Sequence, residues 1–320
     1  MLNAVRRKEI LFPELSYANA DHTRLKRWFI RSVEGLSGRD RYARLYDIWR
    51  RSIAPTGERI FGRMLDLIDV SMHLQGDWPP ADLPDGPLVM IANHPFGIGH
   101  GIAILSLAER LGRPFRVMIN AELLKIPEMK PYSLSIDFNE TKEALQNNLA
   151  VRKEAVALLK QGVTIVIFPG GGVATAPKGF GKAEDLPWKM FPARLIQEAK
   201  ASVVPVHFSG QNGRLFHIVS GPMNMAGEES RLKRMVGQVS LTLRTSLLIR
   251  EFTRLSGRSI SARIGKVIPW SELAPLRDRK ALIMHLYRAV FSLAPQQPAR
   301  RRAMRNRFRR MGADGAHANR

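Results

Sequence analysis

The chain of 320 residues contains no cysteine, which excludes both disulfide bonds and a thiol nucleophile. It has no apolar run that approaches the roughly 20 residues needed to span a bilayer as a helix. It also has no Gly-x-Ser-x-Gly motif, the usual sequence context of an esterase-type serine nucleophile. The sequence therefore describes a globular protein whose chemistry has to use other side chains.

Acidic residues are scarce relative to basic ones. The chain carries 50 Lys and Arg against 28 Asp and Glu, a formal net charge of +22, and its last 100 residues carry 21 against 6. An anionic membrane surface, an acidic carrier protein or a nucleic acid could each bind such a surface. No helix-turn-helix, zinc-finger or RNA-recognition signature accompanies the charge, so nucleic acid is the least favoured of these partners.

Three regions differ in pattern. Residues 1–80 hold a basic, amphipathic helical pattern and are predicted to form an N-terminal helical extension. Residues 81–294 alternate short apolar runs with helical patterns, which predicts an α/β domain whose mainly parallel, mixed sheet is flanked by helices. Residues 295–320 form a basic tail that we expect to be disordered.

The predicted elements follow from the period of the apolar positions. The predicted strands are residues 88–92, 115–119, 132–136, 163–168, 202–208 and 260–264. The predicted helices are residues 22–52, 102–111, 140–160 with Asn139 as N-cap, 189–200, 236–255 and 277–293.

A histidine stands at the end of the first of these strands. Asn93-His94-Pro95 follows the strand, and glycines at 97, 99 and 101 precede the next helical pattern. Such a turn places an imidazole beside free backbone N–H groups, where a general base and an oxyanion cradle can coexist. A capping histidine with no catalytic role is the alternative. His94 and His100 have no further His, Asp or Glu at metal-ligand spacing, so no metal site is predicted.

Four short motifs in order resemble the glycerolipid and lysophospholipid acyltransferase superfamily. They are Asn93-His94 after a strand, Ile136-Asp137 before a helix, Ile167-Phe168-Pro169-Gly170-Gly171-Gly172 after a strand, and Val204-Pro205-Val206 within a strand. Residues 243–251 and 264–269 look like the closing part of a bacterial branch described as hemolysin-like or ornithine-lipid-type acyltransferases.

The resemblance implies an activity and a place in the cell. Members move an acyl group from acyl-CoA or an acyl-carrier-protein onto a hydroxyl of a lyso-lipid in membrane lipid biosynthesis, without a metal or bound cofactor. The partners implied are the lyso-lipid acceptor, the acyl donor and an anionic membrane surface. We therefore expect a peripheral protein on the cytoplasmic face of the inner membrane.

The resemblance also implies roles for individual residues. His94 matches the general base and Asp137 the acid of the second motif, and His100 stands where a partner of the base is expected. Residues implied to shape the site or bind substrate are Asn93, Gly97, Phe168, Pro169, Gly170, Gly171, Gly172, Lys142 and Lys178. For the two lysines, which could hold phosphate groups, an ordinary solvated position is the alternative.

The chain departs from the family pattern after the histidine. The family places an Asp five or six residues beyond it, and these positions here are Gly99 and His100. Three explanations stay open. His100 could hydrogen-bond to the base, Asp137 or Glu140 could reach it from the next motif, or the chain could have kept the fold as a lipid-binding or scaffolding module without catalysis.

A second departure lies in the third motif. Gly170 stands where many members carry glutamate, and Val173-Ala174 stand where a threonine-arginine pair often follows. The loop therefore lacks the side chains that would hold a phosphate. This departure favours an acceptor other than glycerol 3-phosphate.

Overall fold

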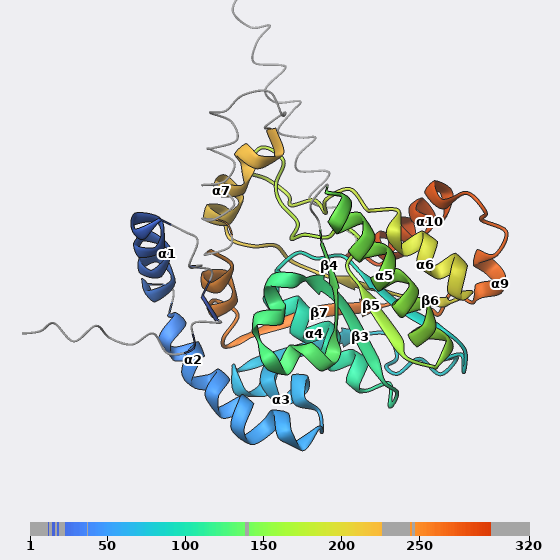
Figure 1. Ribbon diagram of the computed structural model, residues 1–320, viewed down its shortest axis with the longest axis horizontal. Helices are drawn as coiled ribbons and strands as arrows, with labels where there is room; N and C mark the ends of the chain where they lie inside the picture. Colours follow the sequence, from blue (N-terminus) through green and yellow to red (C-terminus); the bar gives the residue numbers. More distant parts are fainter. Residues whose placement is uncertain are drawn as a thin grey trace, which may run out of the picture.

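The computed structural model describes residues 12, 15, 16, 18, 23–36, 38–137, 141–225, 244 and 247–295. These residues build a seven-stranded sheet between two layers of helices (Figure 1). The strands are β1 (Val70–Gln75), β2 (Leu88–Ala92), β3 (Phe115–Asn120), β4 (Ser133–Ile136), β5 (Thr164–Ile167), β6 (Ser202–Phe208) and β7 (Arg258–Ile264). The main helices are α1 (Arg24–Leu36), α2 (Arg39–Ile48), α3 (Ile60–Leu67), α4 (Ile98–Glu109), α5 (Lys142–Lys160), α6 (Phe191–Ala199), α7 (Arg214–Met225), α9 (Trp270–Leu273) and α10 (Arg279–Ser292).

The strand order is β1-β7-β6-β2-β5-β3-β4. All neighbouring pairs are parallel except β6 and β7, which are antiparallel. The predicted class, a mainly parallel mixed sheet flanked by helices with a helical N-terminal region, is therefore confirmed. Because β2 to β6 all run the same way, the segments that follow them lie along one edge of the sheet.

Strand β1 was not predicted. Its six residues lie in what the sequence analysis took as the N-terminal extension, but they pair along their whole length with β7 at the edge of the sheet. Val70, Met72 and Leu74 alternate with polar residues, which is the pattern of a half-buried edge strand. The sheet therefore begins before residue 80.

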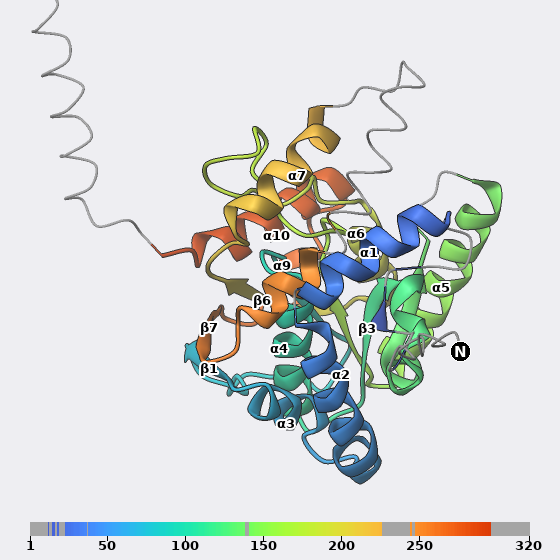
Figure 2. The same cartoon turned by 90° about the vertical axis from the view of Figure 1, so that its left-hand side faces the viewer.

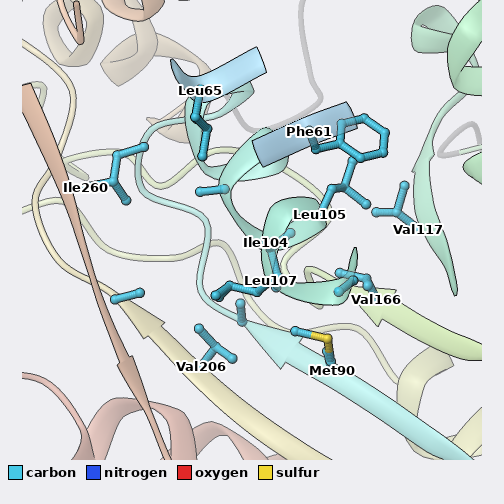
Figure 3. Close-up of a cluster of buried hydrophobic side chains, with 14 of the residues drawn as sticks. Phe61, Leu65, Met90, Ile104, Leu105, Leu107, Val117, Val166, Val206 and Ile260 are labelled. Carbon is cyan, nitrogen blue, oxygen red and sulfur yellow. The ribbon is translucent and has the colours of Figure 1, made fainter. Parts of the chain in front are cut away.

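The apolar residues of each central strand divide between two cores because side chains alternate across a sheet. In β2, Met90 and its neighbours two residues away face α3 and α4, whereas Val89 and Ile91 face α5, α6 and α10. Figure 3 shows the first of these cores, with Phe61 of α3 near Leu105 of α4 and Val117 of β3, and with Ile104 of α4 between α3 and Met90. Figure 2 shows the two helical layers from the side.

Several predicted boundaries change. The helix predicted over residues 22–52 is broken at Gly38, whose φ of 83° is left-handed. The helix predicted from residue 102 begins four residues earlier, at Ile98. The N-cap of α5 is Thr141, whose hydroxyl accepts a hydrogen bond from Ala144 N–H, and Asn139 lies outside the described residues.

The remaining expectations on the C-terminal third are only partly covered. The tail at 296–320 lies outside the described residues, as does half of the helix predicted over 236–255, of which residue 244 and residues 247–253 are helical. None of the described helices is both long and apolar enough to cross a membrane.

Candidate active site

The first and third motifs meet at the edge of the sheet. Because β2 pairs directly with β5, the residues that follow the two strands are neighbours. The rings of His94 and Phe168 lie with centroids 4.0 Å apart, and the N–H of Ala174 donates to the carbonyl of His94 over 2.9 Å. The predicted base therefore lies directly against the glycine-rich loop.

His94 is partly exposed, and its environment favours the neutral imidazole. Burial, and then repulsion from the cation of Arg244, lowers its pKa to about 4. Its Nδ1 atom is buried without a hydrogen-bond partner among the described residues. The ring is therefore uncharged at neutral pH, and no carboxylate of the described part of the chain holds its Nδ1.

The backbone of His94 has a carboxylate partner that the sequence analysis missed. Asp185 Oδ1 accepts the His94 N–H over 3.2 Å, and Oδ2 accepts from Trp188 Nε1 over 3.1 Å. Burial raises the pKa of Asp185, and these two hydrogen bonds oppose that effect. Asp185 comes from a loop 91 positions along the chain, so no motif spacing could have indicated it.

Asn93 locks the strand that carries His94. Its Nδ2 donates to the carbonyl of Phe208 over 2.9 Å, and its Oδ1 accepts the Phe208 N–H over 2.7 Å. Both polar atoms of this buried side chain are thus used between β2 and β6. These two bonds fix the end of the strand that carries His94, and a contact of Asn93 with substrate stays a prediction.

Gly97 makes the turn into α4 possible. Its φ of 67° favours glycine, and a Cβ there would lie 3.1 Å from both Val173 and Leu248. The N–H of Gly101 donates to Gly97 O within the helix, so it is not free as the sequence analysis expected. The N–H groups of the first helical turn have no intrahelical partner and remain the candidate oxyanion donors.

His100 lies in the first turn of α4 and is fully buried. Its ring stacks on Phe208 at 4.4 Å and meets the edge of Phe96 at 4.9 Å. Neither ring nitrogen has a hydrogen-bond partner among the described residues. Burial, and then repulsion from His94, holds its pKa well below the usual value. The hydrogen bond between the two imidazoles that was considered above is therefore not formed.

Asp137 follows β4 at the far edge of the sheet. Strands β5 and β3 separate it from β2, so it is roughly 14 Å from His94 at the strand spacing of a sheet. Its backbone N–H donates to Asn148 Oδ1. Glu140, the other acid considered, lies outside the described residues. Lys142 and Lys178 are both exposed.

The glycines of the third motif are required by close packing. Gly171 has a φ of 69°, which turns the chain after Pro169. A Cβ on Gly170 would lie 3.1 Å from the carbonyl of Leu186, and one on Gly172 would lie 2.8 Å from the Leu186 side chain. The loop therefore carries no side chain here because the segment that holds Asp185 packs over it.

A buried arginine also reaches this loop. The side chain of Arg244 is 7% exposed, and its Nη2 donates to the carbonyl of Val173 over 2.6 Å. Its guanidinium lies 5.4 Å from the centre of the Phe216 ring. The sequence analysis placed Arg244 within the segment 243–251 that resembles the closing part of the family branch, but gave it no role in the site. On a helix, Arg244 lies on the same face as Leu247 and Leu248, three and four residues further on, and this spacing is the signal that could have indicated its burial.

The described residues contain no group of three or more His, Asp or Glu side chains that could hold a metal ion. The site offers instead a neutral histidine, free N–H groups at a helix start and a buried cation. These are the parts that acid–base catalysis on a hydroxyl requires.

Comparisons with known proteins agree with this chemistry. Residues 75–209 match the family model described as Acyltransferase. This match and the two curated relatives described below support the glycerolipid acyltransferase superfamily, so the resemblance drawn from the motifs is confirmed. The chain is an enzyme of the acyltransferase class, and the matches support activity on lyso-lipids or glycerolipids.

Two curated relatives bear the name lyso-glycine lipid O-acyltransferase. The protein of Phocaeicola vulgatus is 24% identical over 208 residues, which is 64% of this chain and 67% of that protein. The protein of Bacteroides thetaiotaomicron is 25% identical over 212 residues, 64% of this chain and 69% of that protein. A crystal structure of the 1-acyl-sn-glycerophosphate (LPA) acyltransferase PlsC from Thermotoga maritima aligns with 84% of this chain and 88% of that one, at 16% identity and a TM-score of 0.44.

Proposed function

We propose that this enzyme transfers an acyl group from a thioester of coenzyme A or acyl-carrier-protein to a hydroxyl of a lyso-lipid, with His94 as general base. The observation that supports the base is the contact between the uncharged His94 ring and the loop after β5. The names of the two curated relatives favour an amino-acid lipid as acceptor, lacking one acyl chain.

In the proposed reaction, His94 Nε2 removes the proton of the acceptor hydroxyl while its oxygen attacks the thioester carbonyl. The tetrahedral intermediate then collapses, the carbon–sulfur bond breaks, and the thiolate takes the proton back from the imidazolium. The N–H groups at the start of α4 are the candidates to stabilise the oxyanion. General-base catalysis of this kind contributes about 10²–10⁴-fold to the rate.

We further propose that the enzyme works as a peripheral protein on the cytoplasmic face of the inner membrane. Three large apolar side chains near the site are exposed: Phe180 at 73%, Ile218 at 57% and Leu215 at 44%. The loop before Phe180 contacts α7, since a Cβ on Gly179 would lie 3.3 Å from Ile218 Cα. Figures 1 and 2 show this yellow-green loop beside α7 in both views. Exposed lysine and arginine flank this apolar patch, which is the composition of a membrane-binding surface: Lys178, Lys182 and Arg214.

The test of the base measures thiol release from an acyl donor in the presence of a lyso-glycine lipid. We expect His94→Ala to lower turnover by at least about 10²-fold. The matched control is His285→Ala, which removes an exposed histidine on α10 and is expected to leave the rate unchanged. Equal turnover in wild type and His94→Ala, with both folded, would remove His94 from the mechanism.

A further inference from the structure

We infer that Arg244 binds a carboxylate on the head group of the acceptor lipid. The inference rests on the proposed function, because it assigns the acceptor chemistry of that same site. The residue lies outside the four motifs that carry the family resemblance. Four observations support it, namely the burial of the cation, its position beside His94, the charges around it and the unpartnered polar groups nearby.

Arg244 is a buried cation that no anion of the described protein neutralises. Only 7% of the residue is exposed, and no Asp or Glu among the described residues lies within the 4.0 Å of an ion pair. Among the described residues, its hydrogen-bond acceptor is the carbonyl of Val173, and its guanidinium lies over the face of Phe216. Buried charges in proteins are normally paired, because an unpaired one is costly. An anion that arrives with the substrate would supply the missing partner.

The position of Arg244 ties it to the reacting histidine. Val173, whose carbonyl accepts its hydrogen bond, is followed by Ala174, whose N–H donates to His94 O. The charge of Arg244 also reaches the His94 ring, where it disfavours the imidazolium. An anion bound at Arg244 would therefore lie close to a hydroxyl held at His94, on the same acceptor molecule.

The surrounding charge favours a carboxylate over a phosphate. Glu251 is only 4% exposed, and both Glu251 and Arg244 act electrostatically on His217. Glu251 is already paired with Arg254 at 3.6 Å. A phosphate monoester carries about −1.5 to −2 charges at neutral pH, which is more than the single guanidinium of Arg244 neutralises. A carboxylate carries one charge and matches the planar fork of a single guanidinium.

Unpartnered polar atoms gather in the same corner. Both side-chain polar atoms of Asn212, which is 2% exposed, lack a partner among the described residues. His217 connects Asn212 with the loop beside His94. It interacts with the backbone of Asn212, and its Nδ1 accepts the N–H of Ala176 over 3.3 Å. A carboxamide offers both a donor and an acceptor, which is the complement of an amide bond. A lipid that carries an amide and a carboxylate would satisfy Asn212 and Arg244 together.

The experiment compares three acceptors: a synthetic N-(hydroxyacyl)glycine, its methyl ester and lysophosphatidic acid. Wild type, Arg244→Gln, Arg244→Lys and the control Arg258→Gln, which changes an exposed arginine at the start of β7, are assayed for thiol release. We expect wild type and the control to prefer the free carboxylate over its ester by at least about tenfold in kcat/KM, mainly through KM. Arg244→Gln should lose that preference, and Arg244→Lys should keep part of it.

An unchanged preference in Arg244→Gln, or an equal fall for acid and ester, would overturn the inference. So would a wild type that uses lysophosphatidic acid best. If circular dichroism shows that Arg244→Gln is unfolded, the inference is tested by two other results. These are the preference of the wild type for the acid over the ester and the reduction of that preference in Arg244→Lys. Binding of the acid and the ester without donor, measured by calorimetry, separates this inference from the proposed function. Acid-selective binding without any thiol release would leave the Arg244 site standing and refute the transfer reaction.

Discussion

Replacing Asp185 tests how the structure holds His94 in place. Asp185→Ala removes both hydrogen bonds of the carboxylate, the one to His94 N–H and the one to Trp188 Nε1. Trp188→Phe removes only the second and keeps an aromatic ring against Tyr287 and Phe291. We expect the first variant to lose both stability and turnover, and the second to lose stability with little change in turnover.

The size of each effect follows from the two bonds. A hydrogen bond to a charged group contributes about 1.5–3 kcal/mol. Burial raises the pKa of Asp185, which means that the ionised carboxylate also carries a desolvation cost. We therefore take the low end of this range, about 1.5 kcal/mol for each bond. The expected loss in the free energy of unfolding is about 3 kcal/mol for Asp185→Ala, which loses two bonds, and about 1.5 kcal/mol for Trp188→Phe, which loses one. A displacement of the catalytic group by about 1 Å can lower the rate about 10²-fold, and we expect a fall of that order in Asp185→Ala.

The assay combines urea unfolding with steady-state thiol release on the same preparations. Asp185→Asn is the third variant, because its side-chain oxygen can still accept the His94 N–H while the charge is lost. We expect it to retain more turnover than Asp185→Ala. If Asp185→Ala and Trp188→Phe lost turnover to the same extent, the bond to His94 would carry no special role. Full turnover in a folded Asp185→Ala would refute the reasoning altogether.

Two further predictions concern the histidine and its strand. Burial and Arg244 lower the pKa of His94 to about 4. We therefore expect kcat/KM to stay level from about pH 8 to about pH 5 and to fall only below that. An inflection near the unperturbed pKa of about 6.5 would contradict the role of His94 as the base. His94 binds a proton more readily in the unfolded chain than in the folded one, so the free energy of unfolding should be highest above about pH 6.5 and decline toward pH 4. Circular dichroism at each pH checks that a fall in rate is not caused by unfolding. Asn93→Ala leaves the buried N–H and carbonyl of Phe208 unpaired, and urea unfolding should show a loss of about 2–4 kcal/mol. A loss below about 1 kcal/mol would mean that water replaces both bonds.

The central strands could be predicted because burial on both faces leaves them uniformly apolar. Residues 88–92 and 202–208 show no alternation, and both are buried throughout, so they stand out in the sequence as strands. Strand β1 escaped because only every second residue is apolar and its partner β7 lies almost 190 positions away. The predicted helix boundaries were wrong where the role of a glycine could not be told from the sequence. Gly38 interrupts a predicted helix, whereas Gly99 lies inside one.

The site was predictable only as far as its residues adjoin strand ends. His94 and Phe168 each follow a central strand, and the pairing of β2 with β5 brings them together. Asp137 also follows a strand, but the strand order, which the sequence does not reveal, puts two strands between it and His94. Asp185 and Arg244 come from a loop and from a distant helix, and only the folded chain brings them to the site.

These two residues bear on both departures of the chain from its family pattern. No acid follows His94 at five or six residues, but a carboxylate holds its backbone from the loop at 185. No arginine follows in the third motif, but the guanidinium of Arg244 reaches the carbonyl of Val173, at the very position where that pair is missing. A motif specifies the position of a group in the sequence, whereas catalysis depends on its position in the folded protein.

Asp185 and Arg244 differ in one respect from the groups that the family pattern places here, because Asp185 contacts the peptide of His94 and not its imidazole. In the proposed reaction, the imidazolium of His94 would therefore lack the direct anionic partner of a triad among the described residues. A carboxylate bound at Arg244 would ease its formation by cancelling the nearby positive charge. The pH profile of kcat, which reports the substrate complex, should then show a higher apparent pKa than that of kcat/KM for the carboxylate acceptor, and no such difference for its ester.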